Sequence, residues 1–179
     1  GWLFVHCGSE ARADDITAFL REALGELPIV PLGSLCQPEA VWGHWLSSGE
    51  LPPDTEIKDE MTLFQPAEDA TVKVKQLPWD SAEVQQLLDA GYRPNQILLT
   101  WDERITVQLN DKSVFKRLKF SDELQEQAAN EGGDSAVAEW EAGLHLMTGA
   151  LRAFTDQYFG WCAQDRPDLP PAEPKAEKS

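Results

Sequence analysis

The sequence predicts an α+β fold in which mixed or antiparallel sheets are flanked by helices and a long helix lies near the C-terminus. Residues 104–120 alternate in polarity as the two strands of a hairpin do, and residues 135–160 carry apolar side chains at helical spacing. Between them and the N-terminus, short strand-like and helix-like stretches alternate. We expect four parts: residues 1–50 in a βαβα arrangement, a strand-rich part at 51–130, a C-terminal helix at 131–162 that packs on the core, and a disordered tail at 163–179.

The first fifty residues predict two strands and two helices. Trp2–Cys7 is apolar and predicts a strand, and Leu27–Leu32, with two prolines, predicts a short edge strand. The apolar spacing of Asp14–Leu24 and of Glu39–Ser47 predicts a helix in each. Because a natural chain rarely begins inside a strand, we expect a longer N-terminal part to precede Trp2.

The middle of the chain predicts further strands around one helix. The polar stretch Glu50–Glu60 is expected to be a loop or a domain joint. Met61–Phe64 and Thr71–Leu77 predict strands, Asp80 is expected to cap a helix that runs through Leu88, and Gln96–Trp101 predicts another strand.

The stretch 104–124 predicts a hairpin with charged ends. Ile105, Val107 and Leu109 alternate with polar residues, and Asn110-Asp111 supplies the turn. Strict alternation in the returning strand, Ser113–Phe120, would place one set of side chains on each face. The first set is Val114, Lys116, Leu118 and Phe120, and the second is Phe115, Arg117 and Lys119.

Two helices are expected after the hairpin. Ser121 can cap the first, which should break at residues 130–134. The longest helix is predicted at Ser135–Gly160, and its apolar stripe should face the core, with tryptophans such as Trp42, Trp45 and Trp140 used in packing.

Charge is distributed unevenly along the chain. The whole protein has a net charge of −16, made of −10 over residues 1–69, +2 over residues 70–120 and −8 over residues 121–179. Four cations and no acid fall between Lys112 and Lys119. Since charges are screened over about 8 Å at physiological salt, a local basic face can act apart from distant acids. The acidic total therefore argues only weakly against a nucleic-acid partner.

Strand alternation predicts a DNA-facing surface. Up to five cations, Lys73, Lys75, Arg104, Arg117 and Lys119, would share a polar sheet face with Gln76, Thr106 and Gln108. Cations on rigid strands with amides and hydroxyls between them suit phosphate contacts that position a duplex without reading its sequence. The same residues also fit a plainer interpretation, as solubilising charges or as edge-strand lysines that prevent aggregation.

Other functional classes find little support in the sequence. His6, Cys7, Cys36 and His44 have no usual zinc spacing, and the three cysteines are expected to be free or buried thiols in a reducing cytosol. There is no GxSxG or GxxxxGK motif, and Gly132-Gly133 is expected to be a helix break. No apolar run approaches the length of a membrane span. We therefore expect a protein that is not an enzyme, without cofactor, metal or membrane partner. Stacking of single-stranded bases on Trp79 or Trp101 finds weak support.

Several collinear stretches resemble RdgC, the bacterial recombination-associated family. They are LREALGELPIVPL at Leu20–Leu32, VKVKQL at Val72–Leu77, ILLTWDERITVQL at Ile97–Leu109, VFKRLKFSDEL at Val114–Leu124 and LMTGAL at Leu146–Leu151. The likeness covers about residues 1–160, and residues 1–50 would then be part of a larger RdgC-like domain.

This resemblance implies a function that the spacing of residues does not. The family forms a ring-shaped homodimer around double-stranded DNA, binds single strands as well, inhibits RecA-dependent recombination, and associates with the nucleoid in the bacterial cytoplasm. No catalytic residue or cofactor is implied. The resemblance maps the family's basic face onto Lys73, Lys75, Gln76 and the run Lys112, Lys116, Arg117 and Lys119. It also implies a long N-terminal portion that helps to close the ring.

A second hypothesis comes from the acidic segments that flank residues 70–120. An acidic protein-interaction module would bind a basic partner, or the recombinase directly, and DNA would be incidental.

Overall fold

The structure, a computed structural model, describes residues 1–131 and 135–163. It divides into two compact units, residues 1–31 and a second unit that begins at Leu32. The predicted break at Gly132-Gly133 and the predicted disordered tail fall outside the described residues, apart from Ala163.

The first unit contains one helix, α1 (Glu10–Leu24). Ser9 caps it by accepting a hydrogen bond from the backbone N–H of Arg12, and Gly25 ends it with a φ of 77°. The predicted helix is therefore confirmed, but the strands predicted at residues 2–7 and 27–32 are wrong, because neither segment forms a strand. A strand needs a neighbour for its backbone groups, and this unit supplies only a helix.

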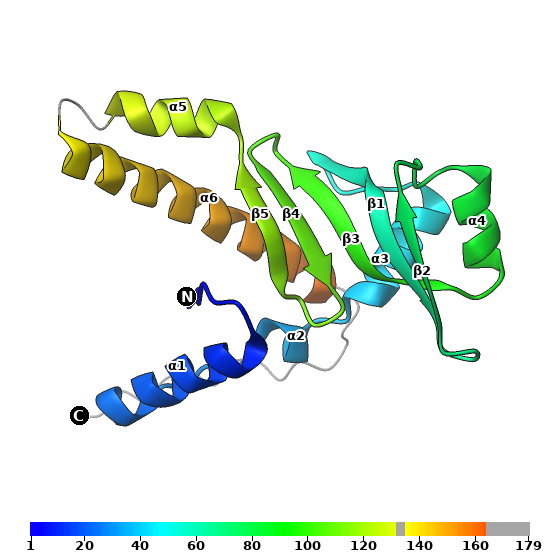
Figure 1. The fold of residues 1–179 in the computed structure, drawn as a ribbon, viewed down its shortest axis with the longest axis horizontal. Coiled ribbons are helices and arrows are strands. Elements are labelled where there is room, and N and C mark those ends of the chain that lie inside the picture. Colours follow the sequence, from blue (N-terminus) through cyan, green and yellow to red (C-terminus); the bar gives the residue numbers. More distant parts are fainter. Residues whose placement is uncertain (132–134, 164–179) are drawn as a thin grey trace. The chain divides into compact units, whose positions relative to one another are not determined.

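The second unit is built on a five-stranded antiparallel sheet with the order β2-β1-β3-β4-β5 (Figure 1). Together with the helices it confirms the predicted α+β class. The strands are β1 (Thr55–Gln65), β2 (Ala70–Lys75), β3 (Arg93–Trp101), β4 (Ile105–Asn110) and β5 (Phe115–Phe120).

The prediction of a loop through residue 60 is wrong for its second half, because β1 starts at Thr55. Residues 55–57 pair with β3, and an irregularity between Ile57 and Met61 interrupts the register. That bulge breaks the alternation of polar and apolar residues, so the charged stretch before Met61 does not look like a strand in the sequence.

One face of the sheet carries the hydrophobic core. It buries Ile97, Leu99 and Val107 against three helices, α3 (Pro38–Ser48), α4 (Ala82–Asp89) and α6 (Ala136–Ala163). Figure 1 shows the strands in front of α3 and α6. The expected helices at Glu39–Ser47 and Asp80–Leu88 are thus confirmed, although the capping residue of α4 is Ser81. The opposite face bears no helix among the described residues of this unit in that view.

Helix α6 is anchored to the core by its C-terminal half. Phe154 and Tyr158 are fully buried, and the Tyr158 hydroxyl hydrogen-bonds the buried Ser113 hydroxyl at 3.0 Å. The long helix is confirmed, but the prediction that its whole stripe faces the core is wrong. Val137 and Trp140 are each 66% exposed, because this end of α6 extends beyond the sheet beside α5 (Asp122–Glu131), as Figure 1 shows.

The short helix α2 (Leu32–Leu35) packs against the turn between β4 and β5. That turn is the predicted one: the Ser113 N–H donates to the Asn110 carbonyl, and the Asn110 side chain accepts from the Val114 N–H. Gly33 lies directly on the Lys112 backbone, where a Cβ would be 2.2 Å from the carbonyl oxygen. The contact therefore requires glycine at position 33.

Candidate nucleic-acid interface

The lysines of β2 lie on the face of the sheet that is turned away from the core. Lys73 pairs with Thr62 of β1 and Lys75 pairs with Glu60, whereas Val74 is buried on the core side. Directly opposed residues of an antiparallel pair project to the same face. Both lysines are exposed, as the alternation of the sequence predicted.

The far edge of the sheet presents two more lysines on this face. Thr106 of β4 pairs with Lys119, and Gln108 pairs with Lys116. The register shifts between these pairs, so Arg117 and Leu118 together oppose one residue of β4. Arg117 is the bulged residue and has a φ of 50°. The prediction that Lys116 and Lys119 face opposite sides is therefore wrong, because the bulge changes the phase of alternation.

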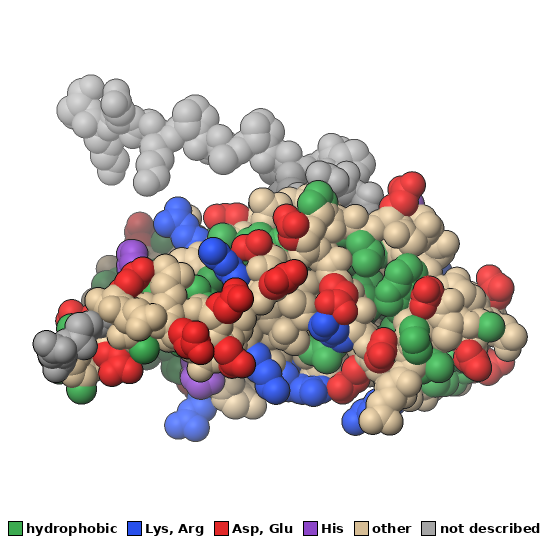
Figure 2. All heavy atoms as spheres, turned by 90° about the horizontal axis from the view of Figure 1, so that it is seen from above, with side chains coloured by type: hydrophobic (Ala, Val, Ile, Leu, Met, Phe, Trp, Pro, Cys, Tyr) green, Lys and Arg blue, Asp and Glu red, His purple; other side chains and the backbone are tan. Residues whose placement is uncertain are grey.

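We call this surface the polar sheet face. By register it comprises Glu56, Glu60, Thr62, Phe64, Thr71, Lys73, Lys75, Gln96, Leu98, Thr100, Thr106, Gln108, Asn110, Lys116 and Lys119. Its lysines lie on the two edge strands, β2 and β5. The strands between them present mainly hydroxyl and amide groups, together with the carboxylates of Glu56 and Glu60 on β1. Four strand spacings of about 4.8 Å separate the two rows by about 19 Å. Acidic side chains lie close to the cations on the side of the molecule seen in Figure 2, where blue and red are mixed.

Arg117 reaches from β5 to β1 and makes an ion pair with Glu60. The guanidinium Nη1 donates to the Glu60 Oε1 at 2.7 Å, although two strands lie between β5 and β1 in the sheet. The pKa of Glu60 is lowered mainly by this hydrogen bond. Burial raises the pKa by a smaller amount, and the positive charges of Arg117 and Lys75 lower it further. The same bond raises the pKa of Arg117.

An open hollow of about 560 Å³ lies beside this ion pair. It is lined by Asp59, Glu60, Lys75, Gln76 and Leu98. Gln76 follows β2 with a φ of 54° and is exposed. Glu60 therefore stands between Lys75, its partner on the neighbouring strand, and Arg117.

Arg104 and Lys112, which were also predicted to bind DNA, are not among the residues that the register places on the polar sheet face. Arg104 lies at the start of β4 and pairs with Asp102 at 3.4 Å, so its charge is balanced locally. Lys112 lies in the turn between β4 and β5. Sequence reasoning also missed Glu60, which is 57 residues from Arg117 and showed no signal of a shared site.

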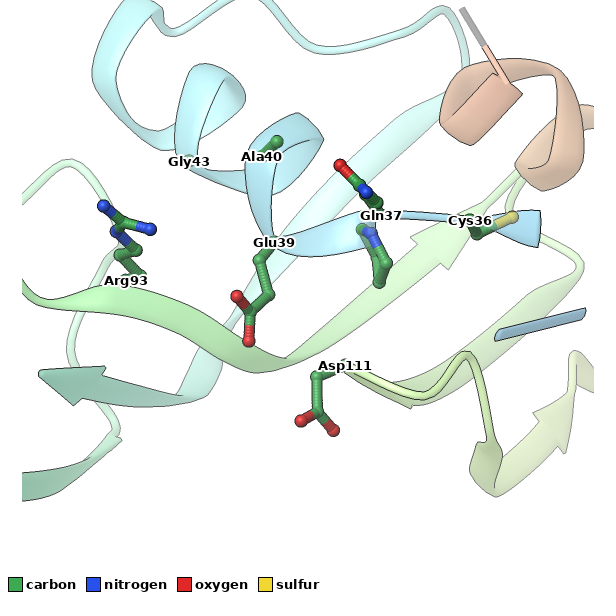
Figure 3. Close-up of a pocket in the computed structure, with 8 residues that line it drawn as sticks. Cys36, Gln37, Glu39, Ala40, Gly43, Arg93 and Asp111 are labelled. Atoms are coloured by element: carbon green, nitrogen blue, oxygen red, sulfur yellow. The ribbon is translucent and has the colours of Figure 1, made fainter. Parts of the chain in front are cut away.

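A second hollow, of about 550 Å³, opens at the start of α3 (Figure 3). Glu39 lies there between Arg93 of β3 and Asp111 of the hairpin turn. Burial and then the charge of Asp111 raise the pKa of Glu39, and Arg93 opposes them. With two carboxylates against one guanidinium, this hollow suits a phosphate less well than the polar sheet face does.

The remaining predictions concern metals, thiols and membranes. Over residues 1–131 and 135–163, no group of three or more His, Cys, Asp or Glu side chains could hold a metal ion. None of the three cysteines forms a disulfide, and Cys36 and Cys162 are buried. None of the described helices is both long and apolar enough to span a bilayer.

Comparison with known proteins gives a consistent result over most of the chain. A family described as "Putative exonuclease, RdgC" matches residues 1–162. Curated relatives named "Recombination-associated protein RdgC" include those of Pseudomonas fluorescens (37% identical over 148 residues), Pseudomonas aeruginosa (36% over 160 residues) and Pseudomonas putida (34% over 160 residues). These alignments cover 82%, 89% and 89% of this chain, and 48%, 52% and 52% of the relatives. The chain thus spans about half the length of the curated relatives it matches.

Proposed function

The chain belongs to the RdgC family, and we propose that it binds double-stranded DNA through the polar sheet face without reading the base sequence. The observation that carries the proposal is that Lys73, Lys75, Lys116 and Lys119 share one face, free of helices in the described part of the unit, in a protein of net charge −16. The two lysine rows are separated by about the width of a duplex. Hydroxyls and amides between them suit additional contacts to phosphate and sugar.

A charge-reversal experiment tests this interface. Four lysine–phosphate contacts predict a slope of about −3.6 in log K against log salt, and Lys116→Glu with Lys119→Glu should reduce it to about −1.8. The control, Arg21→Glu with Arg152→Glu, makes the same change in net charge on α1 and on an exposed part of α6. Fluorescence anisotropy with several unrelated duplexes and one single strand measures the affinity and the salt slope of both variants. Equal loss in the two variants would reject the polar sheet face as the contact surface.

We propose further that the whole protein is a homodimer that encircles DNA at the nucleoid and limits access of the recombinase RecA. The support is membership of a family whose curated relatives are named for recombination. Closing a ring adds a topological hold to weak phosphate contacts, so slower dissociation is expected from circular than from short linear DNA. Equal dissociation rates from the two, measured with a full-length protein, would argue against encirclement.

The alternative is direct binding of the recombinase by the acidic segments. Titration of the purified recombinase without DNA distinguishes the two functions. Binding that survives Lys116→Glu with Lys119→Glu would favour this alternative.

We propose binding without strand cleavage, although the matching family's description includes the word exonuclease. The same duplexes, end-labelled and incubated with Mg²⁺ or Mn²⁺, test this part. A nuclease activity that copurifies with the protein, gives shortened products and is lost in a variant of this chain would overturn this part of the proposal.

A further inference from the structure

The ion pair between Arg117 and Glu60 occupies a position where a backbone phosphate would be expected to bind. Arg117 directs its positive charge toward the interior of the polar sheet face, since its guanidinium pairs with Glu60 of β1 across two intervening strands. Glu60 is also the cross-strand partner of Lys75. A carboxylate that is bound by a guanidinium, with an ammonium group on the neighbouring strand, imitates the charge of a phosphate and its acceptor oxygens.

We propose that Glu60 is an internal competitor for a phosphate-binding subsite formed by Arg117 and Lys75, and that it thereby sets the affinity of the polar sheet face for DNA. This inference rests on the proposed function. It identifies Glu60, an acidic residue among the cations that would bind phosphate, as a residue that determines the affinity. The subsite would accept one phosphodiester group of the DNA backbone.

The local structure favours exchange of the carboxylate for a phosphate. The side chain of Arg117 is 51% exposed, so an incoming phosphate can reach it without rearrangement of the core. The adjoining hollow, with Lys75 and Gln76 in its lining, leaves room for the displaced carboxylate. The Glu60 side chain is 24% exposed, so the pair is partly open to water, and ion pairs near the surface contribute at most about 1 kcal/mol to stability. Breaking this one therefore costs little.

Counterions give the exchange a measurable signature. In the parent protein, the phosphate releases its counterion on binding, but the displaced Glu60 attracts a cation in return, so this contact adds little to the salt dependence. Glu60→Gln removes that compensation, and the salt slope should steepen by about 0.9, from about −3.6 to about −4.5. The gain in affinity over the parent should therefore be about three times larger at 50 mM than at 200 mM salt.

The experiment is a double-mutant cycle in duplex binding with a charge-matched control. Glu60→Gln should strengthen binding more than Glu126→Gln, which removes one acid from an exposed position on α5. In an Arg117→Gln background, the effect of Glu60→Gln should shrink to that of Glu126→Gln. An equal effect of Glu60→Gln with and without Arg117 would overturn the competition and leave only a general effect of charge.

A second measurement separates this inference from the proposed function. Inorganic phosphate is titrated into ¹⁵N-labelled protein while the Nε–Hε resonance of Arg117 is followed by NMR. The resonance should shift at lower phosphate concentration in Glu60→Gln than in the parent or in Glu126→Gln. If this is observed while no variant binds DNA, the subsite is supported and the DNA-binding function is wrong. If DNA binds but Arg117 responds equally in all three proteins, the function is supported and the competition is wrong.

Discussion

Replacing Gly33 with alanine should destabilise the second unit, because α2 lies directly on the backbone of the hairpin turn. A Cβ at this position would be 2.2 Å from the Lys112 carbonyl oxygen and 2.8 Å from the carbonyl carbon, whereas real Cβ contacts essentially never fall below 3.0 Å. The obstacle is backbone, so no side-chain rotation can relieve it. Either α2 or the turn must move by roughly 1 Å.

The expected loss of stability follows from two opposing contributions. Forcing an extra methyl group into a packed contact costs about 1–3 kcal/mol. Alanine recovers up to about 1 kcal/mol by restricting the unfolded chain. The free energy of unfolding should therefore fall by about 1–2 kcal/mol, which lowers the melting temperature by roughly 2–8 °C in a unit of this size.

Gly149→Ala in α6 is a matched control with the opposite expected sign. Gly149 is exposed, and a Cβ there would meet nothing within 4 Å. Alanine should stabilise this helix by about 0.5–1 kcal/mol. Urea unfolding of the parent and both variants, followed by tryptophan fluorescence and by circular dichroism, measures the three free energies. If Gly33→Ala is as stable as Gly149→Ala, the close approach of α2 to the turn is wrong.

Three further predictions concern the core and the ion pair. Phe154→Ala should lower the free energy of unfolding by about 3–5 kcal/mol in the same urea assay, since its side chain is fully buried, and a loss below about 1 kcal/mol would contradict that burial. Tyr158→Phe should cost about 0.5–1.5 kcal/mol through the lost hydrogen bond to Ser113, and an unchanged urea midpoint would argue against this bond. Glu60 has a lowered pKa in the folded state, so its stabilising effect is present above its ordinary value of 4.5 and is lost as pH falls through the lowered value. The stability difference between the parent and Glu60→Gln should accordingly disappear in acid, and a difference that grows as pH falls would contradict the pairing with Arg117.

The elements of the second unit were predictable where apolar and polar residues alternate without interruption. Ile105, Val107 and Leu109 alternate through the whole of β4, and all three are buried as expected. The strands at the start of the chain were predicted from apolar content alone. They failed because apolar side chains do not supply the neighbouring strand that backbone hydrogen bonds require.

The cationic surface was only partly predictable, because the bulge in β5 controls which of its side chains face the polar side. Arg117 adopts a left-handed conformation that glycine or asparagine would have signalled and arginine does not. The pairing of Arg117 with Glu60 depends on the position of β1 between β2 and β3, which local patterns do not determine.

The exposed N-terminal end of α6 shows that a long helix can extend beyond the surface that buries its apolar side. A helix of 28 residues is about 42 Å long, and α6 meets the sheet through its C-terminal half, where Phe154 and Tyr158 pack on Phe115. The sheet can therefore cover only part of the stripe, and Val137, Trp140 and Leu144 extend past it. Periodicity identifies the apolar side of a helix but does not say how much of that side is covered.

The acidic excess outside residues 70–120 has a consequence for the proposed DNA contact. Segments with net charges of −10 and −8 repel a polyanion, and the lysines of β2 and β5 can offset this repulsion only within about a Debye length, near 8 Å, of the phosphates. The acids would thus orient the duplex on the polar sheet face while lowering the total affinity. Glu60 would act in the same direction at closer range, since it occupies a cation inside that face until a phosphate displaces it. An acidic protein built in this way would hold DNA weakly and in one orientation, which is compatible with the proposal that ring closure supplies the remaining hold.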